Sequence, residues 1–216
     1  MTEVRKLAAE GLGTALLLTI IVGSGIMGER LAGGNAAIAL LANSIATGAG
    51  LFARSHVFDP ISGAHFNPVV TLALTWRGDS KRTRVLPFLA AQVVGAILGV
   101  WLAHLMFELP ILQASTKVRT GLGQWSAEAT ATFGLVLLIL LGMRRQSPGL
   151  PAAIAVYIVA AYWFTASTSF ANPAVTIARS LSNTFAGIAP ADAPGFIAAQ
   201  ITGALLATVL ARVLDD

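Results

Sequence analysis

Long stretches free of Asp, Glu, Lys and Arg alternate with short charged segments along the chain. The uncharged stretches cover residues 11–28, 31–53, 85–107, 146–178 and 193–211. Each reaches the roughly 18 to 20 residues needed to cross a bilayer core as a helix. A further stretch, 129–143, reaches that length only if the helix begins near Gln124 and takes Glu128 into the membrane. The pattern predicts an all-α membrane protein.

Two apolar segments do not fit single spans. Residues 60–76 become helix-like only after Asn67-Pro68, which leaves a helix of roughly 15 Å, half a membrane. The run 146–178 is too long for one span and is interrupted at Asn172-Pro173. We divide it into a span over about 150–168 and a second half-length helix over 172–182. The prediction is six transmembrane helices and two re-entrant half-helices.

The charges between the spans predict the orientation. With the amino terminus inside, ten of the 14 Lys and Arg residues fall on the inner side. This topology obeys the positive-inside rule, and the inverted one breaks it. We therefore expect a multi-pass protein of the cell (inner or plasma) membrane with both termini cytoplasmic. The inner set is Arg5, Lys6, Arg54, Arg77, Lys81, Arg82, Arg84, Arg144, Arg145 and Arg212.

The two halves of the chain resemble each other. Three motifs recur in the same order: Ala-Glu at 9–10 and 127–128, Asn-Pro-x-Val-Thr at 67–71 and 172–176, and Ala-Ala-Gln at 90–92 and 198–200. Each half holds three spans, an odd number, so the second copy must be inverted relative to the first. Inverted repeats place a transport site near the midplane, between the copies. We interpret residues 1–216 as one domain with repeats at about 1–115 and 120–216.

An Asn-Pro pair starts a helix and leaves the side-chain NH₂ of Asn available as a hydrogen-bond donor. Asn67 and Asn172 cap their helices through the side-chain oxygen, and Pro68 and Pro173 suit the first helical position. The amide NH₂ groups can then face a solute, and each helix presents about half a positive charge at its amino end. Extended segments before both helices, 62–66 and 167–171, are expected to line a pore with carbonyl oxygens. Such a lining suits small neutral solutes and repels cations.

These motifs resemble the two signature boxes of the aquaporin, or major intrinsic protein, family. The boxes read Asn67-Pro68-Val69 and Asn172-Pro173-Ala174, and the resemblance covers essentially the whole chain. It implies an hourglass fold, a homotetramer in the lipid bilayer with one pore per subunit, and passive flow. It also places His65 beside the inner vestibule.

The chain departs from the family pattern at the expected outer constriction, the selectivity filter. The family usually has Arg after the second box, where this chain has Val175, and the next Arg is Arg179, one turn on. Counting along the second span places Asn43 where an aromatic residue is common. Arg179 itself lies either in the vestibule or on the surface. The contributor from the fifth span is left open among Val159, Ala160 and Tyr162.

Glu10 and Glu128 are carboxylates within predicted spans, where charged groups are usually functional. One interpretation is a proton-coupled carrier that uses Glu10 or Glu128. The interpretation we favour is structural: each carboxylate accepts hydrogen bonds from the re-entrant loop of its own half, since both recur at equivalent positions. The small residues at 95–96, 99, 203–204 and 207 are expected to be close helix contacts.

Composition excludes several other functions. The chain has no cysteine, and its three histidines lack metal-ligand spacing, so no cofactor or metal site is predicted and an enzyme is disfavoured. The chain lacks a basic stripe with interleaved aromatic residues, so the sequence does not predict nucleic-acid binding. We expect a channel for water and small uncharged solutes. Without the filter Arg, it should also admit polyols, urea or metalloid hydroxides such as arsenous acid.

Overall fold

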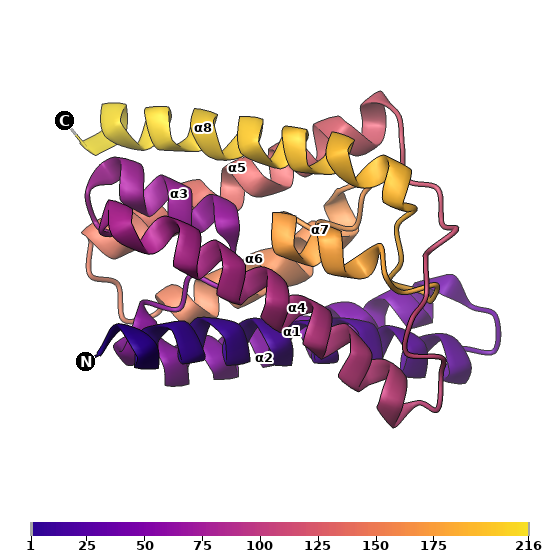
Figure 1. The fold of residues 1–216 in the computed structure, drawn as a ribbon. Helices are drawn as coiled ribbons and strands as arrows, with labels where there is room; N and C mark the ends of the chain where they lie inside the picture. Colours follow the sequence, from indigo (N-terminus) through magenta and orange to yellow (C-terminus); the bar gives the residue numbers. More distant parts are fainter. Residues whose placement is uncertain (1, 216) are drawn as a thin grey trace.

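The computed structural model describes residues 2–215 and is built from α-helices and short 3₁₀ turns throughout. The helices are α1 (Glu3–Leu31), α2 (Ala36–Ser62), α3 (Pro68–Arg77), α4 (Val85–Met106), α5 (Leu122–Arg144), α6 (Leu150–Phe164), α7 (Pro173–Arg179) and α8 (Ala193–Asp215), with 3₁₀ turns η1 (Arg82–Arg84) and η2 (Pro190–Asp192). Figure 1 shows the long helices running side by side, with α3 and α7 enclosed between them. The start of α1 and the end of α8 lie at the same end of the bundle.

The two repeats pack in the same way. Helix α1 lies against α4 in the first repeat, and α5 lies against α8 in the second. A Cβ atom on Gly95 would lie 2.1 Å from the carbonyl oxygen of Gly11, and one on Gly203 would lie 2.2 Å from that of Ala129. Backbones this close tolerate only glycine. The prediction of close helix contacts at Gly95 and Gly203 is confirmed.

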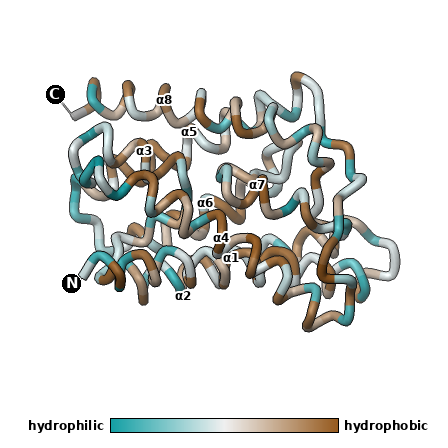
Figure 2. The backbone as a smooth tube through the Cα atoms, viewed as in Figure 1, coloured by the Kyte–Doolittle hydropathy of each residue, from teal (hydrophilic) through white to brown (hydrophobic). Residues whose placement is uncertain are grey.

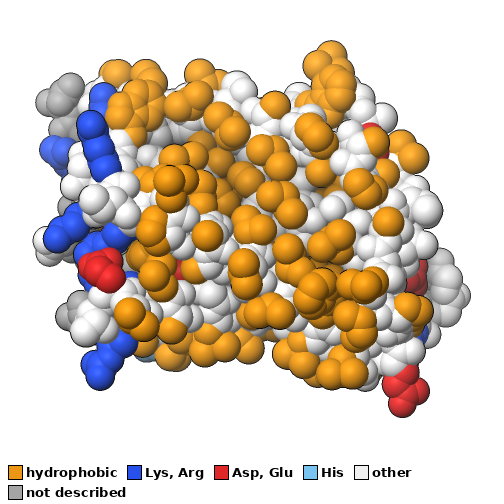
Figure 3. Space-filling view, in the orientation of Figure 1, with side chains coloured by type: hydrophobic (Ala, Val, Ile, Leu, Met, Phe, Trp, Pro, Cys, Tyr) orange, Lys and Arg blue, Asp and Glu red, His pale blue; other side chains and the backbone are white. Residues whose placement is uncertain are grey.

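Within residues 2–215, five helices are long and apolar enough to cross a membrane: α1, α2, α4, α5 and α8. Figure 2 shows hydrophobic segments along the middle of the bundle, and Figure 3 shows apolar side chains over most of the visible face. Lys and Arg side chains gather at the end that carries the termini (Figure 3). Helix α6 is shorter, with 15 residues. The predicted span to residue 168 is wrong at its end, because the backbone becomes extended at Thr165 and starts the second re-entrant segment.

Two other predicted boundaries also move. Helix α2 does not end at Ala53 but continues to Ser62, where Gly63 in the left-handed conformation (φ 88°) closes it. Arg54 is therefore a residue of a membrane helix, and its assignment to a cytoplasmic loop is wrong. Charge alone does not stop a helix, and α2 continues past Arg54 and even past Pro60 before Gly63 ends it. Helix α7 ends at Arg179, three residues earlier than predicted.

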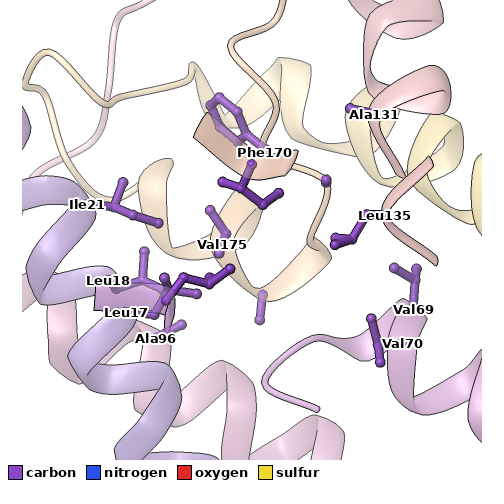
Figure 4. Packing of buried hydrophobic residues seen from close by; sticks show 14 of the residues in the cluster. Leu17, Leu18, Ile21, Val69, Val70, Ala96, Ala131, Leu135, Phe170 and Val175 are labelled. Atoms are coloured by element: carbon purple, nitrogen blue, oxygen red, sulfur yellow. The ribbon is translucent and has the colours of Figure 1, made fainter. Parts of the chain in front are cut away.

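The hydrophobic core joins the two repeats. Figure 4 shows Leu17, Ile21, Val70, Leu135 and Val175 directed toward the same region, from α1, α3, α5 and α7. Since both half-helices contribute, neither repeat buries its own apolar face alone. This shared core fixes the relative position of α3 and α7.

Candidate functional site

The site is built around the facing amino ends of α3 and α7. The side-chain oxygen of Asn67 accepts from the amide of Val69 at 3.1 Å, and that of Asn172 accepts from the amide of Ala174 at 3.0 Å. The predicted caps are thus formed. Each amide NH₂ also reaches the opposite repeat: Asn67 Nδ2 donates to the carbonyl of Ala171 at 2.8 Å, and Asn172 Nδ2 donates to that of Phe66 at 2.9 Å. This bond uses one of the two N–H groups of each amide, so the Asn residues also link the repeats, which the sequence did not predict.

The sequence predicts extended segments before the half-helices, but the backbone there also contains left-handed residues. Ala64 and Phe66 have φ of 49° and 49°, and their repeat partners Ser169 and Ala171 have φ of 50° and 48°. Left-handed backbone costs about 1–2 kcal/mol for a residue with a side chain. The alternating conformation brings successive N–H groups together, as an anion requires.

The anion in the first repeat is the carboxylate of Glu10, which is fully buried. It accepts four hydrogen bonds: from Ser62 Oγ at 2.7 Å, from the amides of His65 at 3.0 Å and Phe66 at 2.7 Å, and from Gln92 Nε2 at 2.8 Å. Two of these donors are consecutive backbone amides, so the carboxylate sets the left-handed turn. These are the contacts expected if Glu10 supports the re-entrant loop of its own repeat.

Glu128 repeats this network in the second half, also fully buried. Its donors are Ser167 Oγ at 2.6 Å, the amides of Phe170 at 2.8 Å and Ala171 at 2.9 Å, and Gln200 Nε2 at 2.6 Å. Each carboxylate oxygen accepts two of the bonds. Neither Glu therefore offers a carboxylate oxygen without partners.

A narrow cavity of about 70 Å³, here called the lumen, runs past both Asn residues. Loop residues before each half-helix form one wall, and apolar side chains of α1, α5 and α6 form the other; the apolar set is Leu17, Ile21, Leu135, Ile139, Ile154 and Ile158. A wider cavity of about 430 Å³, here called the inner vestibule, shares Ser55 and Ala64 with the lumen. A polar wall facing an apolar wall limits the hydrogen bonds that a solute can make inside.

His65 lies in the lumen wall beside Ala64, and so next to the inner vestibule. Its Nδ1 is 3.1 Å from Thr71 Oγ1, and its ring meets Phe88 edge-on with centroids 5.3 Å apart. The repeat partner of His65 is Phe170, which meets Phe196 in the same way at 5.1 Å. The first repeat thus has a polar ring where the second has an apolar one.

The lumen wall opposite α7 comes from Thr47 of α2 and Tyr162 of α6, whose oxygens lie 3.2 Å apart. Val175 of α7 lines the same cavity. Asn43 does not line it, because its Nδ2 donates to the carbonyl of Ile21 at 2.8 Å and ties α2 to α1. The position expected of Asn43 is taken by Thr47, one turn along. The count from the sequence missed it because the length of the loop before the half-helix was unknown.

Of the three α6 residues left open, only Tyr162 lines the lumen. Val159 instead packs against Gly48, where an added Cβ would lie 2.3 Å from its side chain. A phenol hydroxyl at this position offers a solute both a donor and an acceptor.

Arg179 lies in the lumen wall and is 2% exposed, so it is not a surface charge. Its guanidinium carbon lies 3.4 Å from the centroid of the Phe170 ring, and Nε donates to the carbonyl of Ala186. Nη1 has no hydrogen-bond partner among the described residues. Lys117 and Arg119 lie on the same side, and burial together with the charge of Arg119 lowers the pKa of Lys117. Three cationic side chains, Arg179, Lys117 and Arg119, therefore lie near the same end of the lumen.

Arg54 is a lumen residue that the sequence reasoning missed. It is 8% exposed, and its guanidinium carbon lies 4.2 Å from the centroid of the Phe66 ring. The signal was present in the spacing of Thr47, Leu51 and Arg54, which lie at i, i+4 and i+7 on one helix face. The charge pattern instead counts Arg54 among the residues between spans, because the uncharged stretch before it ends at residue 53.

Comparison with known proteins agrees with this arrangement. Residues 1–166 match the family model described as major intrinsic protein. The chain is 53% identical to aquaglyceroporin AqpS of Rhizobium meliloti (strain 1021) over 97% of this chain and 90% of that protein. It is 31% identical to the glycerol uptake facilitator protein of Bacillus subtilis (strain 168) over 64% and 56% of the two chains. Its fold is similar to the X-ray structure of the aquaglyceroporin from Plasmodium falciparum, with a TM-score of 0.76, 17% identity and coverage of 96% and 94%.

Proposed function

This chain belongs to the major intrinsic protein family, and we propose that it is a passive channel for water and small uncharged solutes of about the size of glycerol. It is an integral, multi-pass membrane protein. The lumen supports the proposal, since it presents amide donors from Asn67 and Asn172 beside an apolar wall. A solute that both donates and accepts hydrogen bonds can replace its water there, whereas a cation meets two helix amino ends.

The proposed range of solutes rests on the presence of Val175 in the lumen wall. Val175 places an isopropyl group at the position where the family usually has Arg, so residue 175 offers neither a donor nor a charge, and the guanidinium in this region comes from Arg179 one turn away. We propose that the constriction admits polyols, urea and metalloid hydroxides such as arsenous acid. Each of these is neutral near pH 7, compact and rich in hydroxyl or amide groups.

A proton-coupled carrier is the alternative, and the hydrogen bonds argue against it. Such a carrier needs a carboxylate that takes up and releases protons while facing the solute. Glu10 and Glu128 each accept four bonds from neutral donors of their own repeat. Protonation would break this arrangement and release the loop.

We also propose a homotetramer with both termini in the cytoplasm, from family membership and charge distribution respectively. Lys and Arg gather at the end of the bundle where the chain starts and finishes (Figure 3). Native mass spectrometry tests the assembly, and labelling of cysteines introduced next to Glu3 and Arg212 in right-side-out vesicles tests the orientation.

Proteoliposomes loaded with the purified protein test the channel directly. Stopped-flow light scattering measures water, glycerol and urea permeability, and metal analysis measures arsenous acid uptake. We expect flux to rise linearly with the gradient, with weak temperature dependence and no response to a pH gradient. Saturable uptake driven by protons would establish the carrier instead.

A further inference from the structure

We propose that Arg54 forms a second selectivity site, at the inner end of the lumen, that binds hydroxyl oxygens of neutral solutes and repels cations. The inference rests on the proposed channel function and adds a residue to it. Arg54 is distinct from Arg179, since the first lies on α2 and the second on α7. The lumen thus carries a guanidinium from a membrane-spanning helix as well as one from a half-helix.

The platform under Arg54 is rigid. Its guanidinium stacks on Phe66, whose amide donates to Glu10 at 2.7 Å and whose carbonyl accepts from Asn172 at 2.9 Å. A Cβ on Gly13 would lie 2.1 Å from the Phe66 ring, so this glycine makes room for the ring in α1. The stacked guanidinium is therefore held against the same loop that carries the signature box.

Two donor atoms of the Arg54 guanidinium have no partner in the described part of the chain. Nε and Nη1 have no hydrogen-bond partner among the described residues although the side chain is more than nine-tenths buried. Glu10 attracts the charge through space, but its oxygens accept their four hydrogen bonds from Ser62, Gln92 and the loop amides. A buried donor without a partner is costly. A solute oxygen passing through the lumen would supply the missing acceptor.

The position of Arg54 fits the inner end. It lies seven residues beyond Thr47 on the same helix, about 10 Å along the axis, and the next residue, Ser55, lines both the lumen and the inner vestibule. A solute entering from outside would pass Arg179, then the Asn pair, then Arg54. Cation exclusion would thus be divided between the two ends, which offsets the missing charge at Val175.

Two neutral replacements separate charge from donors. Arg54→Met keeps the length and removes both, while Arg54→Gln keeps an N–H donor and removes the charge. We expect both variants to pass Na⁺ and K⁺ about tenfold faster than wild type or more, because one full charge in a narrow low-dielectric lumen is lost. Glycerol permeability relative to water should fall several-fold in Arg54→Met and less in Arg54→Gln.

Arg82→Met is the matched control, because Arg82 is exposed near the start of α4, outside the lumen. It should leave cation flux and the glycerol-to-water ratio at wild-type values. The readouts are cation-sensitive dyes and stopped-flow scattering on the same proteoliposomes. Water flow in each variant, together with size-exclusion elution, shows whether the fold persists.

Wild-type cation flux and a wild-type glycerol-to-water ratio in both folded variants would overturn the proposal. If Arg54→Met does not fold, the cation flux of Arg54→Gln alone tests the proposal. The proposed function fails separately, if wild-type protein conducts neither water nor glycerol passively. An effect on thermal stability without an effect on cation flux would assign Arg54 a packing role and also contradict the proposal.

Discussion

The two repeats of this chain agree behind the lumen and differ at its surface. Glu10 and Glu128 each collect a serine, two consecutive amides and a glutamine, with every distance between 2.6 and 3.0 Å. At the lumen the Asn pair and Val70 with Val175 still correspond, but the charged residue does not: Leu74 stands at the repeat position of Arg179, since 179 − 74 and 172 − 67 both equal 105.

This difference has a physical cause. Each buried carboxylate has all of its hydrogen bonds satisfied by four donors. Replacing the carboxylate or one of the donor residues leaves a buried charge or donor unpaired. A residue in the lumen wall has solute on one side, so its replacement costs less. The halves therefore keep the same support and acquire different lumen chemistry, with Arg54 on one side and Arg179 on the other.

The largest effect should come from the carboxylates that support the loops. Glu10→Gln and Glu128→Gln turn one acceptor oxygen into a donor that faces the donors of Gln92 or a loop amide. We expect each to destabilise the protein by about 1–3 kcal/mol for every buried donor left without an acceptor, seen as lost folded protein on size exclusion and a lower melting temperature in detergent. Glu108→Gln, an exposed loop carboxylate, should be neutral. A tolerated change in only one repeat would show that their supports are not equivalent.

The next effect concerns the Asn residues. Asn67→Asp and Asn172→Asp keep an N-cap but replace the NH₂ donor to the opposite loop by an oxygen facing a carbonyl. Water permeability should fall by about tenfold or more, at 1.4 kcal/mol per decade, and cation leak can rise. Asn35→Asp is the control, since Asn35 caps α2 with bonds of 3.0 and 3.2 Å outside the lumen. Full activity in both lumen variants would contradict their assignment to the pore.

A smaller effect is expected at the outer constriction. Val175→Arg adds a second guanidinium from the helix turn before Arg179, with the two Cβ atoms about 6 Å apart, in a lumen of about 70 Å³. Glycerol and arsenous acid uptake should fall by a larger factor than water flow. The double variant Val175→Arg with Arg179→Met removes the repulsion and should recover water flow more than glycerol flow. Unchanged solute ratios in Val175→Arg would mean that the filter lies elsewhere.

The smallest effect should follow from Tyr162→Phe. The change removes only the hydroxyl, which lies 3.2 Å from Thr47 Oγ1, and keeps the ring. We expect the glycerol-to-water ratio to change by less than about threefold, since one neutral hydrogen bond contributes about 0.5–1.5 kcal/mol and water can take its place. Tyr157→Phe is a matched control, because its hydroxyl donates to the carbonyl of Ala131 outside the lumen. A larger change in Tyr162→Phe would make this hydroxyl a principal filter group.

The sequence by itself determined what depends on local pattern. The duplicated Asn-Pro boxes, their caps and the half-length of both helices follow from residue types at adjacent positions. The duplication also predicted that Glu10 and Glu128 have equivalent surroundings, which the hydrogen bonds show. Their contacts with the loops could be inferred because buried carboxylates require donors, and each repeat offers the same ones.

Only the tertiary structure decided which side chains reach the lumen. Asn43 and Thr47 differ by about 40° around the axis of α2. Packing of α2 against α1 and α6 sets which of the two side chains faces the lumen. Arg54 reads as a loop charge until the helix is seen to continue past it. The cross-link of each Asn to the other repeat likewise depends on contacts between residues about 105 positions apart, which no local pattern specifies.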